Sequence, residues 1–142
     1  MKHLKSYKLF ESISNKDLEL DVRDMFLELE EEEGEHRYYV GVSMRPSGVD
    51  MFCVEAARDD LFQWSDVKDY FERAKEYVCE NGWILTKVIL NYYPQSLLTS
   101  LDSQVVKFPG SDWENFRQFV SDPKFIEDNM IYEIALIFDP KK

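Results

Sequence analysis

The chain has 142 residues, of which 44% are apolar, 15% aromatic and 32% charged. This composition is typical of one folded domain with its own core and excludes a disordered chain. The net charge of −11 argues against direct binding to nucleic acid, because phosphate contacts need a basic face. It favours a basic partner, a cation or simple solubility.

Cysteine usage and hydropathy indicate the compartment. Two cysteines, Cys53 and Cys79, are too few for a disulfide framework, and we expect buried free thiols in a reducing environment. The N-terminus does not resemble a signal peptide, and no run approaches the ~18 to 20 apolar residues that span a bilayer. We therefore expect a soluble, cytoplasmic protein that is one domain over residues 1–142.

Residues 1–14 precede the first strong periodicity. Lys2, Lys5 and Lys8 make this segment basic, and four apolar side chains suit it to dock on the domain: Leu4, Tyr7, Leu9 and Phe10. We expect a docking arm or extension. A strand is the alternative, although the segment lacks β-branched residues.

The next stretch predicts an amphipathic helix over Lys16–Glu31. Its apolar residues recur at helical spacing and form one stripe: Leu18, Val22, Met25, Phe26 and Leu29. From Asp17 to Glu35 the chain holds ten carboxylates and one arginine. Glu30 to Glu33 fall at the helix C-terminus, where the helix dipole disfavours negative charge, and nothing local requires them there.

A hairpin and a second helix follow. Alternation predicts strands over Arg37–Met44 and Val49–Ala57, joined by a turn at residues 45–48. The clearest helical period in the chain covers Asp66–Glu80, with Ser65 as the expected N-cap.

The C-terminal half predicts two more strands, over Trp83–Tyr93 and Met130–Phe138. Between them, Gln95–Gly110 suggests a helical turn and a loop. Ser111–Glu114 has the form of a capping box that opens a third helix, which Asp122-Pro123 closes. The fold class is therefore α+β: a two-layer sandwich of a four-stranded, mostly antiparallel mixed sheet with about three helices, in the order αββαβ(α)αβ.

Catalytic and metal-binding motifs are not recognisable. The two histidines, His3 and His36, match no nucleophile–base arrangement and no helical metal pair, and EF-hand spacing and a glycine-rich phosphate loop are both missing. We predict no catalytic residue, no cofactor and no metal. Trp64, Tyr39 and Tyr93 lie at element edges and are the candidate exposed contact residues.

The acidic run has two interpretations. A charge run most often forms a solvated face that keeps a protein soluble. The alternative is a surface that docks on a basic groove, such as one built for nucleic acid, with faster association through charge complementarity. In that case the contact residues are Glu28, Glu30, Glu31, Glu32, Glu33 and Glu35.

Several segments in order resemble small uncharacterised proteins of tailed bacteriophages. They are the opening MKHLKSYKLFES, the helix DVRDMFLELEEE, the helix start WSDVKDYFERA and the closing strand MIYEIALIF. The resemblance implies a phage-encoded accessory protein acting in the host cytoplasm, and it carries over no activity or site residue.

Three functions compete under this interpretation. We favour a non-enzymatic protein that binds the basic surface of a host defence or nucleic-acid-handling enzyme, in the manner of an inhibitor. A virion structural or assembly component is the alternative, and a small hydrolytic enzyme is the weakest. No contact with a membrane is expected, and the oligomeric state stays open.

Overall fold

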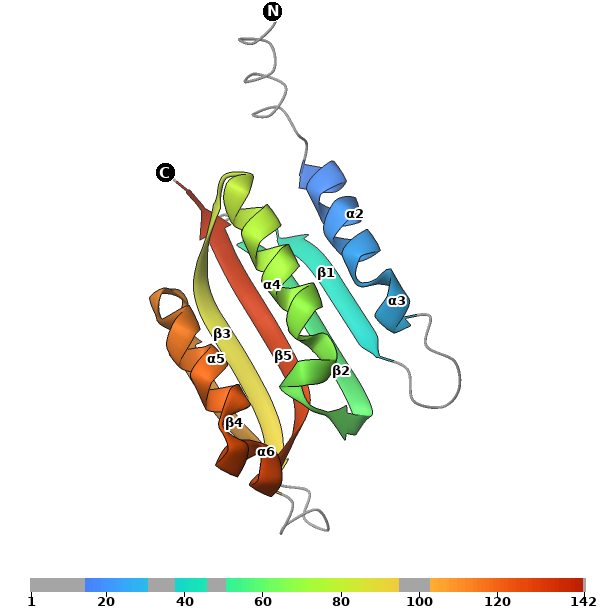
Figure 1. Cartoon of the computed structure of the whole chain (residues 1–142). Coiled ribbons are helices and arrows are strands. Elements are labelled where there is room, and N and C mark those ends of the chain that lie inside the picture. The colour runs from blue at the N-terminus through green and yellow to red at the C-terminus, as the bar shows by residue number, and fades with distance from the viewer. Residues whose placement is uncertain (1–14, 31–37, 46–50, 95–102, 142) are drawn as a thin grey trace, which may run out of the picture.

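A computed structural model describes residues 15–30, 38–45, 51–94 and 103–141. Over these ranges the chain forms five strands and five α-helices in an α+β arrangement, which confirms the predicted class (Figure 1). In chain order the elements are α2 (Asn15–Met25), α3 (Leu27–Glu30), β1 (Tyr39–Arg45), β2 (Met51–Phe62), α4 (Trp64–Glu80), β3 (Trp83–Pro94), β4 (Gln104–Pro109), a 3-10 turn (Gly110–Asp112), α5 (Trp113–Ser121), α6 (Pro123–Asp128) and β5 (Asn129–Pro140).

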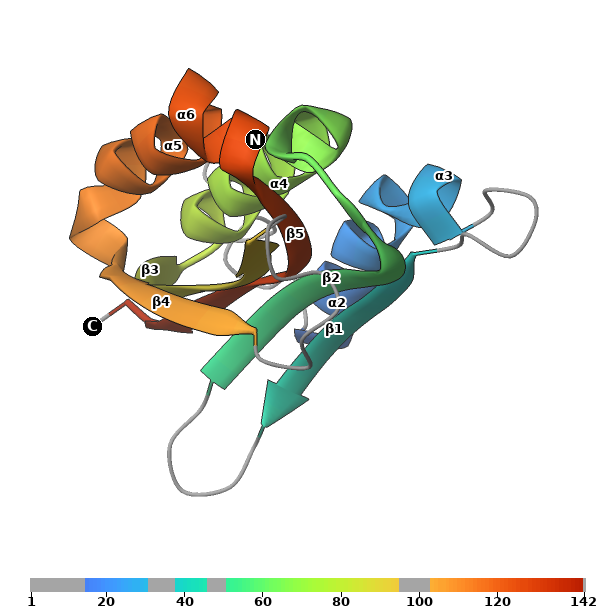
Figure 2. The ribbon, with the colours of Figure 1, turned by 90° about the horizontal axis from the view of Figure 1, so that it is seen from below.

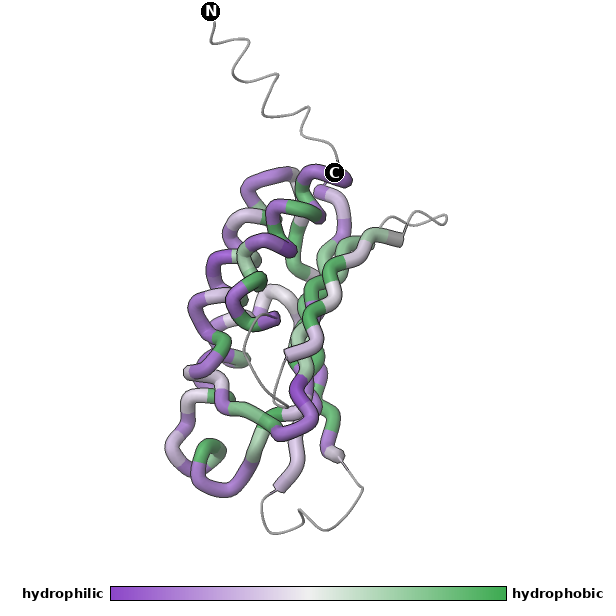
Figure 3. The backbone as a smooth tube through the Cα atoms, turned by 90° about the vertical axis from the view of Figure 1, so that its right-hand side faces the viewer, coloured by the Kyte–Doolittle hydropathy of each residue, from purple (hydrophilic) through white to green (hydrophobic). Residues whose placement is uncertain are grey.

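The sheet has the order β1-β2-β5-β3-β4, and every neighbouring pair is antiparallel. The prediction of a four-stranded, mostly antiparallel mixed sheet with about three helices was therefore close but not exact: the described residues form one more strand and two more helices, and no pair of strands is parallel. All described helices lie on one side of the sheet, and Figures 2 and 3 show the other side uncovered by any of them. The hydrophobic stretches of the tube in Figure 3 are concentrated in the strands next to this helical layer.

The first helix is broken where the prediction made it continuous. α2 ends at Met25, α3 begins at Leu27, and Phe26 lies in the turn between them. The predicted apolar stripe is nevertheless confirmed. Met25 is half-buried, and the other four side chains are buried in the core: Leu18, Val22, Phe26 and Leu29. Phe26 packs edge-on against Phe71 of α4, with ring centroids 5.2 Å apart, so the stripe attaches the N-terminal helices to the centre of the helical layer.

Two elements in the C-terminal half were not predicted. Gln104–Pro109, interpreted from the sequence as a loop, is the edge strand β4 and pairs with β3. Asp122-Pro123 closes α5 at Ser121 as predicted, but Pro123 is also the first residue of the unpredicted helix α6, a position where no helical N–H hydrogen bond is needed. The Asp122 side chain caps α6 by accepting a hydrogen bond from the Lys124 N–H (2.8 Å).

Two predicted caps were also wrong. Ser111 does not cap the third helix, because a 3-10 turn precedes it and the N-cap is Asp112. The second helix begins at Trp64 and not after Ser65, with Gln63 as its N-cap. The Gln63 N–H donates to the Asp66 carboxylate (3.0 Å), so the side chain at the third helical position satisfies the N–H of the cap residue.

Of the three candidate contact aromatics, Tyr39 is 63% exposed, Tyr93 is half-buried, and Trp64 is 3% exposed and packs in the core. The prediction for Trp64 was therefore wrong. Its ring packs against Phe71, Trp113 and Phe116, at the junction of α4 and α5. Cys53 and Cys79 are free thiols, as predicted, but they are half-buried. No helix among the described residues is long and apolar enough to cross a membrane.

Candidate functional site

The acidic side of α2 and α3 is the first candidate surface. Asp17, Asp21, Asp24 and Glu28 are exposed, and we call these four side chains the acidic helical face. Each directly precedes a residue of the apolar stripe, and successive helix positions are about 100° apart around the axis. The carboxylates therefore form a row beside the buried stripe.

Two tyrosines of α4 hold this row in place. The Tyr77 hydroxyl donates to the Asp21 carboxylate at 2.5 Å, and the Tyr70 hydroxyl donates to the Glu28 carboxylate at 2.8 Å. The two tyrosines are seven residues apart and so are the two acids, about 10.5 Å along a helix in both cases. The two bonds therefore form in register between helices that run side by side in opposite directions (Figure 1).

The Tyr77 hydroxyl responds to this negative charge. The hydrogen bond to Asp21, followed by burial and the charges of Asp21 and Asp17, raises the pKa of Tyr77 to about 12 from 10.0. Tyr77 is therefore a hydroxyl donor to Asp21 throughout the neutral pH range. The acidic helical face is thus an ordered array of charge, and not only a set of freely solvated side chains.

Basic side chains near this face are directed elsewhere. Arg23 of α2 donates to the Val42 carbonyl of β1 at 3.1 Å, so its charge lies against the sheet. The Arg73 guanidinium lies 5.9 Å from the centroid of the Tyr70 ring. The described residues of α2, α3 and α4 together contain 11 carboxylates and five basic side chains, so this part of the helical layer is strongly acidic.

The predicted contact residues divide into two groups. Glu28 lies on the acidic helical face, and Glu30 is half-buried at the end of α3. Glu31, Glu32, Glu33 and Glu35 lie outside the described residues, as does the predicted arm 1–14. Sequence reasoning missed Asp17, Asp21 and Asp24 as contact candidates, although their spacing of four and three residues matches Glu28 and was visible in the sequence.

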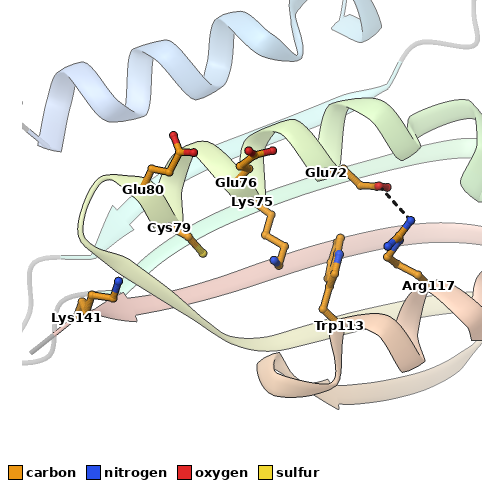
Figure 4. A pocket seen from close by; sticks show the side chains of 8 residues that line it. All are labelled: Glu72, Lys75, Glu76, Cys79, Glu80, Trp113, Arg117 and Lys141. Atoms are coloured by element: carbon orange, nitrogen blue, oxygen red, sulfur yellow. Dashed lines mark ion pairs between the residues drawn. The ribbon is translucent and has the colours of Figure 1, made fainter.

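A pocket of about 580 Å³ lies on the other flank of α4, between this helix and α5 (Figure 4). Its wall includes Cys79 and Trp113, three acids (Glu72, Glu76, Glu80) and three basic side chains (Lys75, Arg117, Lys141). The Lys75 ammonium lies 5.3 Å from the centroid of the Trp113 ring, and Arg117 pairs with Glu72 at 3.5 Å. The charges balance, so the pocket selects neither anions nor cations by net charge.

A pair of carboxyl groups lies on the uncovered side of the sheet. Glu55 of β2 and Glu133 of β5 are diagonal neighbours there, since Glu55 is opposite Ala135 and Glu133 is opposite Ala57. Burial, followed by the charge and the hydrogen bond of Glu133, raises the pKa of Glu55. Asn91 of β3 donates to Glu133 at 2.7 Å, which fixes one member of the pair.

Gly41 of β1 leaves space for the Glu55 side chain. A Cβ atom at Gly41 would lie 2.8 Å from Oε1 of Glu55, so the carboxyl group extends across the glycine. Sequence analysis did not find this arrangement, because Gly41, Glu55, Asn91 and Glu133 come together only through strand pairing.

Within the described residues, no group of three or more histidine, cysteine or acidic side chains has the arrangement of a metal site. Comparison of the chain with protein-family models, with curated proteins and with solved structures found no match in any of the three.

Proposed function

We propose that this protein is a non-enzymatic binding protein whose acidic helical face docks on a basic surface of another protein. The observation that carries the proposal is the row of four carboxylates along α2 and α3, of which Asp21 and Glu28 are hydrogen-bonded to tyrosines of α4. Side chains already held in one arrangement lose less conformational freedom on binding than free ones.

The charge distribution supports a basic partner. A concentrated negative surface raises the rate of encounter with a positive one and repels partners of its own sign. Basic grooves of this kind occur on proteins that handle nucleic acid. The proposed partner is therefore a protein with such a groove, and added duplex DNA competes for the same surface.

The test is affinity capture from the cells in which the protein is made, at about 50 mM and about 500 mM salt, since screening over this range shortens the reach of surface charges severalfold. The helical variant carries Asp17→Asn, Asp24→Asn and Glu28→Gln. The control variant removes three exposed carboxylates outside α2, α3 and α4, through Asp59→Asn, Glu114→Gln and Glu127→Gln.

We expect one partner that is retained at low salt, is released at high salt or by duplex DNA, and is bound more weakly by the helical variant than by the wild type and the control variant. Each exposed ion pair that disappears weakens binding by about 0.2–1 kcal/mol, so the helical variant loses roughly threefold to a hundredfold in affinity, which titration of the captured partner measures. Equal loss in both triple variants would show that overall charge, and not this face, drives binding. Wild-type affinity in the helical variant contradicts the proposal.

A further inference from the structure

The uncovered side of the sheet, which we call the open sheet face, carries both apolar and acidic side chains. Three of the six exposed large hydrophobic side chains among the described residues lie on it: Tyr39 of β1, Ile84 of β3 and Val105 of β4. Half-buried Ile89 and Ile137 lie between these positions. These apolar side chains are interspersed with charged ones, so an occupant of this face would need both apolar and charged groups.

The charges of this face are unevenly distributed. Glu55, Glu133 and Asp139 lie on β2 and β5, and Lys87 and Lys107 lie on β3 and β4. The half of the sheet that adjoins β1 is therefore acidic. Two carboxyl groups in contact there repel each other when both are ionised, and a cation placed between them removes that repulsion.

A second copy of the same face is the competing occupant, because a two-fold axis parallel to the strands would place the acidic half of one copy on the basic half of the other. The segment 1–14 has the complementary chemistry. It holds three lysines and one acid, with Leu4, Tyr7, Leu9 and Phe10 interspersed among the lysines. Within this acidic chain it is a basic and apolar stretch.

The segment is also attached at a suitable place and is long enough. It joins the fold at Asn15, the start of α2, and α2 packs along β1 at the edge of the sheet (Figure 1). Arg23 of α2 reaches Val42 of β1, so the eight residues back to Asn15 add about 12 Å along the strands. Crossing the sheet edge adds roughly 10 Å, and two strand spacings from β1 to β5 add about 10 Å more. Fourteen extended residues span at most about 46–50 Å, which exceeds this path of about 32 Å.

We propose that residues 1–14 of each chain cover the open sheet face of the same chain, with a lysine of the segment between Glu55 and Glu133 and its apolar side chains on Tyr39, Ile89 and Ile137. Gly41 leaves the Glu55 carboxyl group accessible from the β1 side, from which the segment arrives. The proposal is independent of the acidic helical face and of any partner that this face binds.

The experiment places a nitroxide spin label on residue 6 of the full chain. Ser6→Cys is labelled in a Cys53→Ala, Cys79→Ala background, and the methyl groups of alanine and isoleucine carry carbon-13. We expect the strongest paramagnetic broadening at the methyl groups of Ala57, Ala135, Ile89 and Ile137 on the open sheet face. Ile126 on α6 is the reference outside this face and stays sharp.

Substitution separates this docking from general electrostatics. Glu55→Gln with Glu133→Gln should abolish the selective broadening, whereas Asp24→Asn with Glu76→Gln removes the same charge from the helical layer and should leave it intact. The pair Glu55→Gln and Glu133→Gln could alter the fold, which circular dichroism would show. In that case the lysines of the segment are replaced instead, through Lys2→Gln, Lys5→Gln and Lys8→Gln. We again expect the selective broadening to disappear.

Two results would overturn the proposal. One is broadening that is strongest on α2 and α4, which would place the segment on the acidic helical face. The other is broadening that vanishes when the labelled chain is diluted in a large excess of unlabelled chain, which would make the contact intermolecular. Persistence of open-face broadening under dilution supports docking within one chain.

Discussion

Replacement of Asp21 by Asn tests whether the acidic helical face is held in place by α4. In the wild type, the Tyr77 hydroxyl donates to Asp21 at 2.5 Å, and its pKa is raised from 10.0 to about 12. This shift corresponds to a roughly hundredfold weaker acid. The largest cause is the hydrogen bond to a charged carboxylate, which an amide does not reproduce.

In Asp21→Asn we expect the pKa of Tyr77 to fall most of the way to 10. Burial and the charge of Asp17 remain, so the value should stay slightly above that of a free tyrosine. The raised pKa also determines how the stability of the fold changes with pH. The Tyr77–Asp21 bond contributes fully below pH 10 and is lost as the pH rises from 10 to about 12, where the phenolate forms.

The assay is a pH titration of the tyrosine ring by carbon-13 NMR or by absorbance at the phenolate band. The chain has eight tyrosines, so Tyr77→Phe identifies the late-titrating component by its disappearance. Glu28→Gln removes a carboxylate from the same face without touching this bond, and it is the matched control. Circular dichroism at each pH verifies that the fold persists. A late component that is unchanged in Asp21→Asn, or missing from the wild type, would refute the reasoning.

Two further predictions concern the sheet. Gly110→Ala should destabilise the protein by about 1–3 kcal/mol in urea denaturation, because the added Cβ collides with the Leu85 backbone carbonyl. Gly82→Ala is the comparison, because an added Cβ there has open space but the backbone φ is +96°. We expect Gly82→Ala to lose about 1–2 kcal/mol of stability from backbone strain alone. Unchanged stability in Gly110→Ala would argue against the collision. The raised pKa of Glu55 means that its folded state holds the proton more tightly, so its contribution is full below the ordinary value of 4.5 and declines as pH rises through the raised value. In the Lys2→Gln, Lys5→Gln, Lys8→Gln variant, which places no lysine between the two carboxyl groups, Glu55→Gln should therefore gain stability relative to its parent as the pH rises above 4.5. Glu76→Gln removes the same charge from the helical layer and serves as the comparison, and parallel curves for the two substitutions would contradict the assignment.

Strong local periodicity was sufficient to predict much of the secondary structure. The helix α4 and the strands β3 and β5 each carry a long periodic or apolar pattern over 12 to 17 residues, and each was predicted within about two residues of its ends. The stripe of α2 and α3 was predicted residue by residue, because burial of one helix face demands that spacing.

Short strands and helices were harder to predict, because their brief periodicity occurs beside residues that favour turns. In Gln104–Pro109 the alternation of Val106 and Phe108 is brief and ends in Pro-Gly, which favoured a loop. Pro123 can both end one helix and start another. Only the structure, in which the Asp122 carboxylate caps the following turn, shows that a second helix, α6, begins there. Trp64 was placed at an edge by its position between elements, but α5 packs against it and buries it.

The sequence by itself determined the excess of carboxylates, the apolar faces of the elements and the α+β class, because composition and periodicity are properties of neighbouring residues. Only the tertiary structure decided which carboxylates are held in place. Asp21 meets Tyr77 across 56 positions of the chain, and Glu55 meets Glu133 across two strands whose pairing the sequence does not specify. Contacts between distant residues depend on strand order and helix packing, and these follow from the whole core acting together.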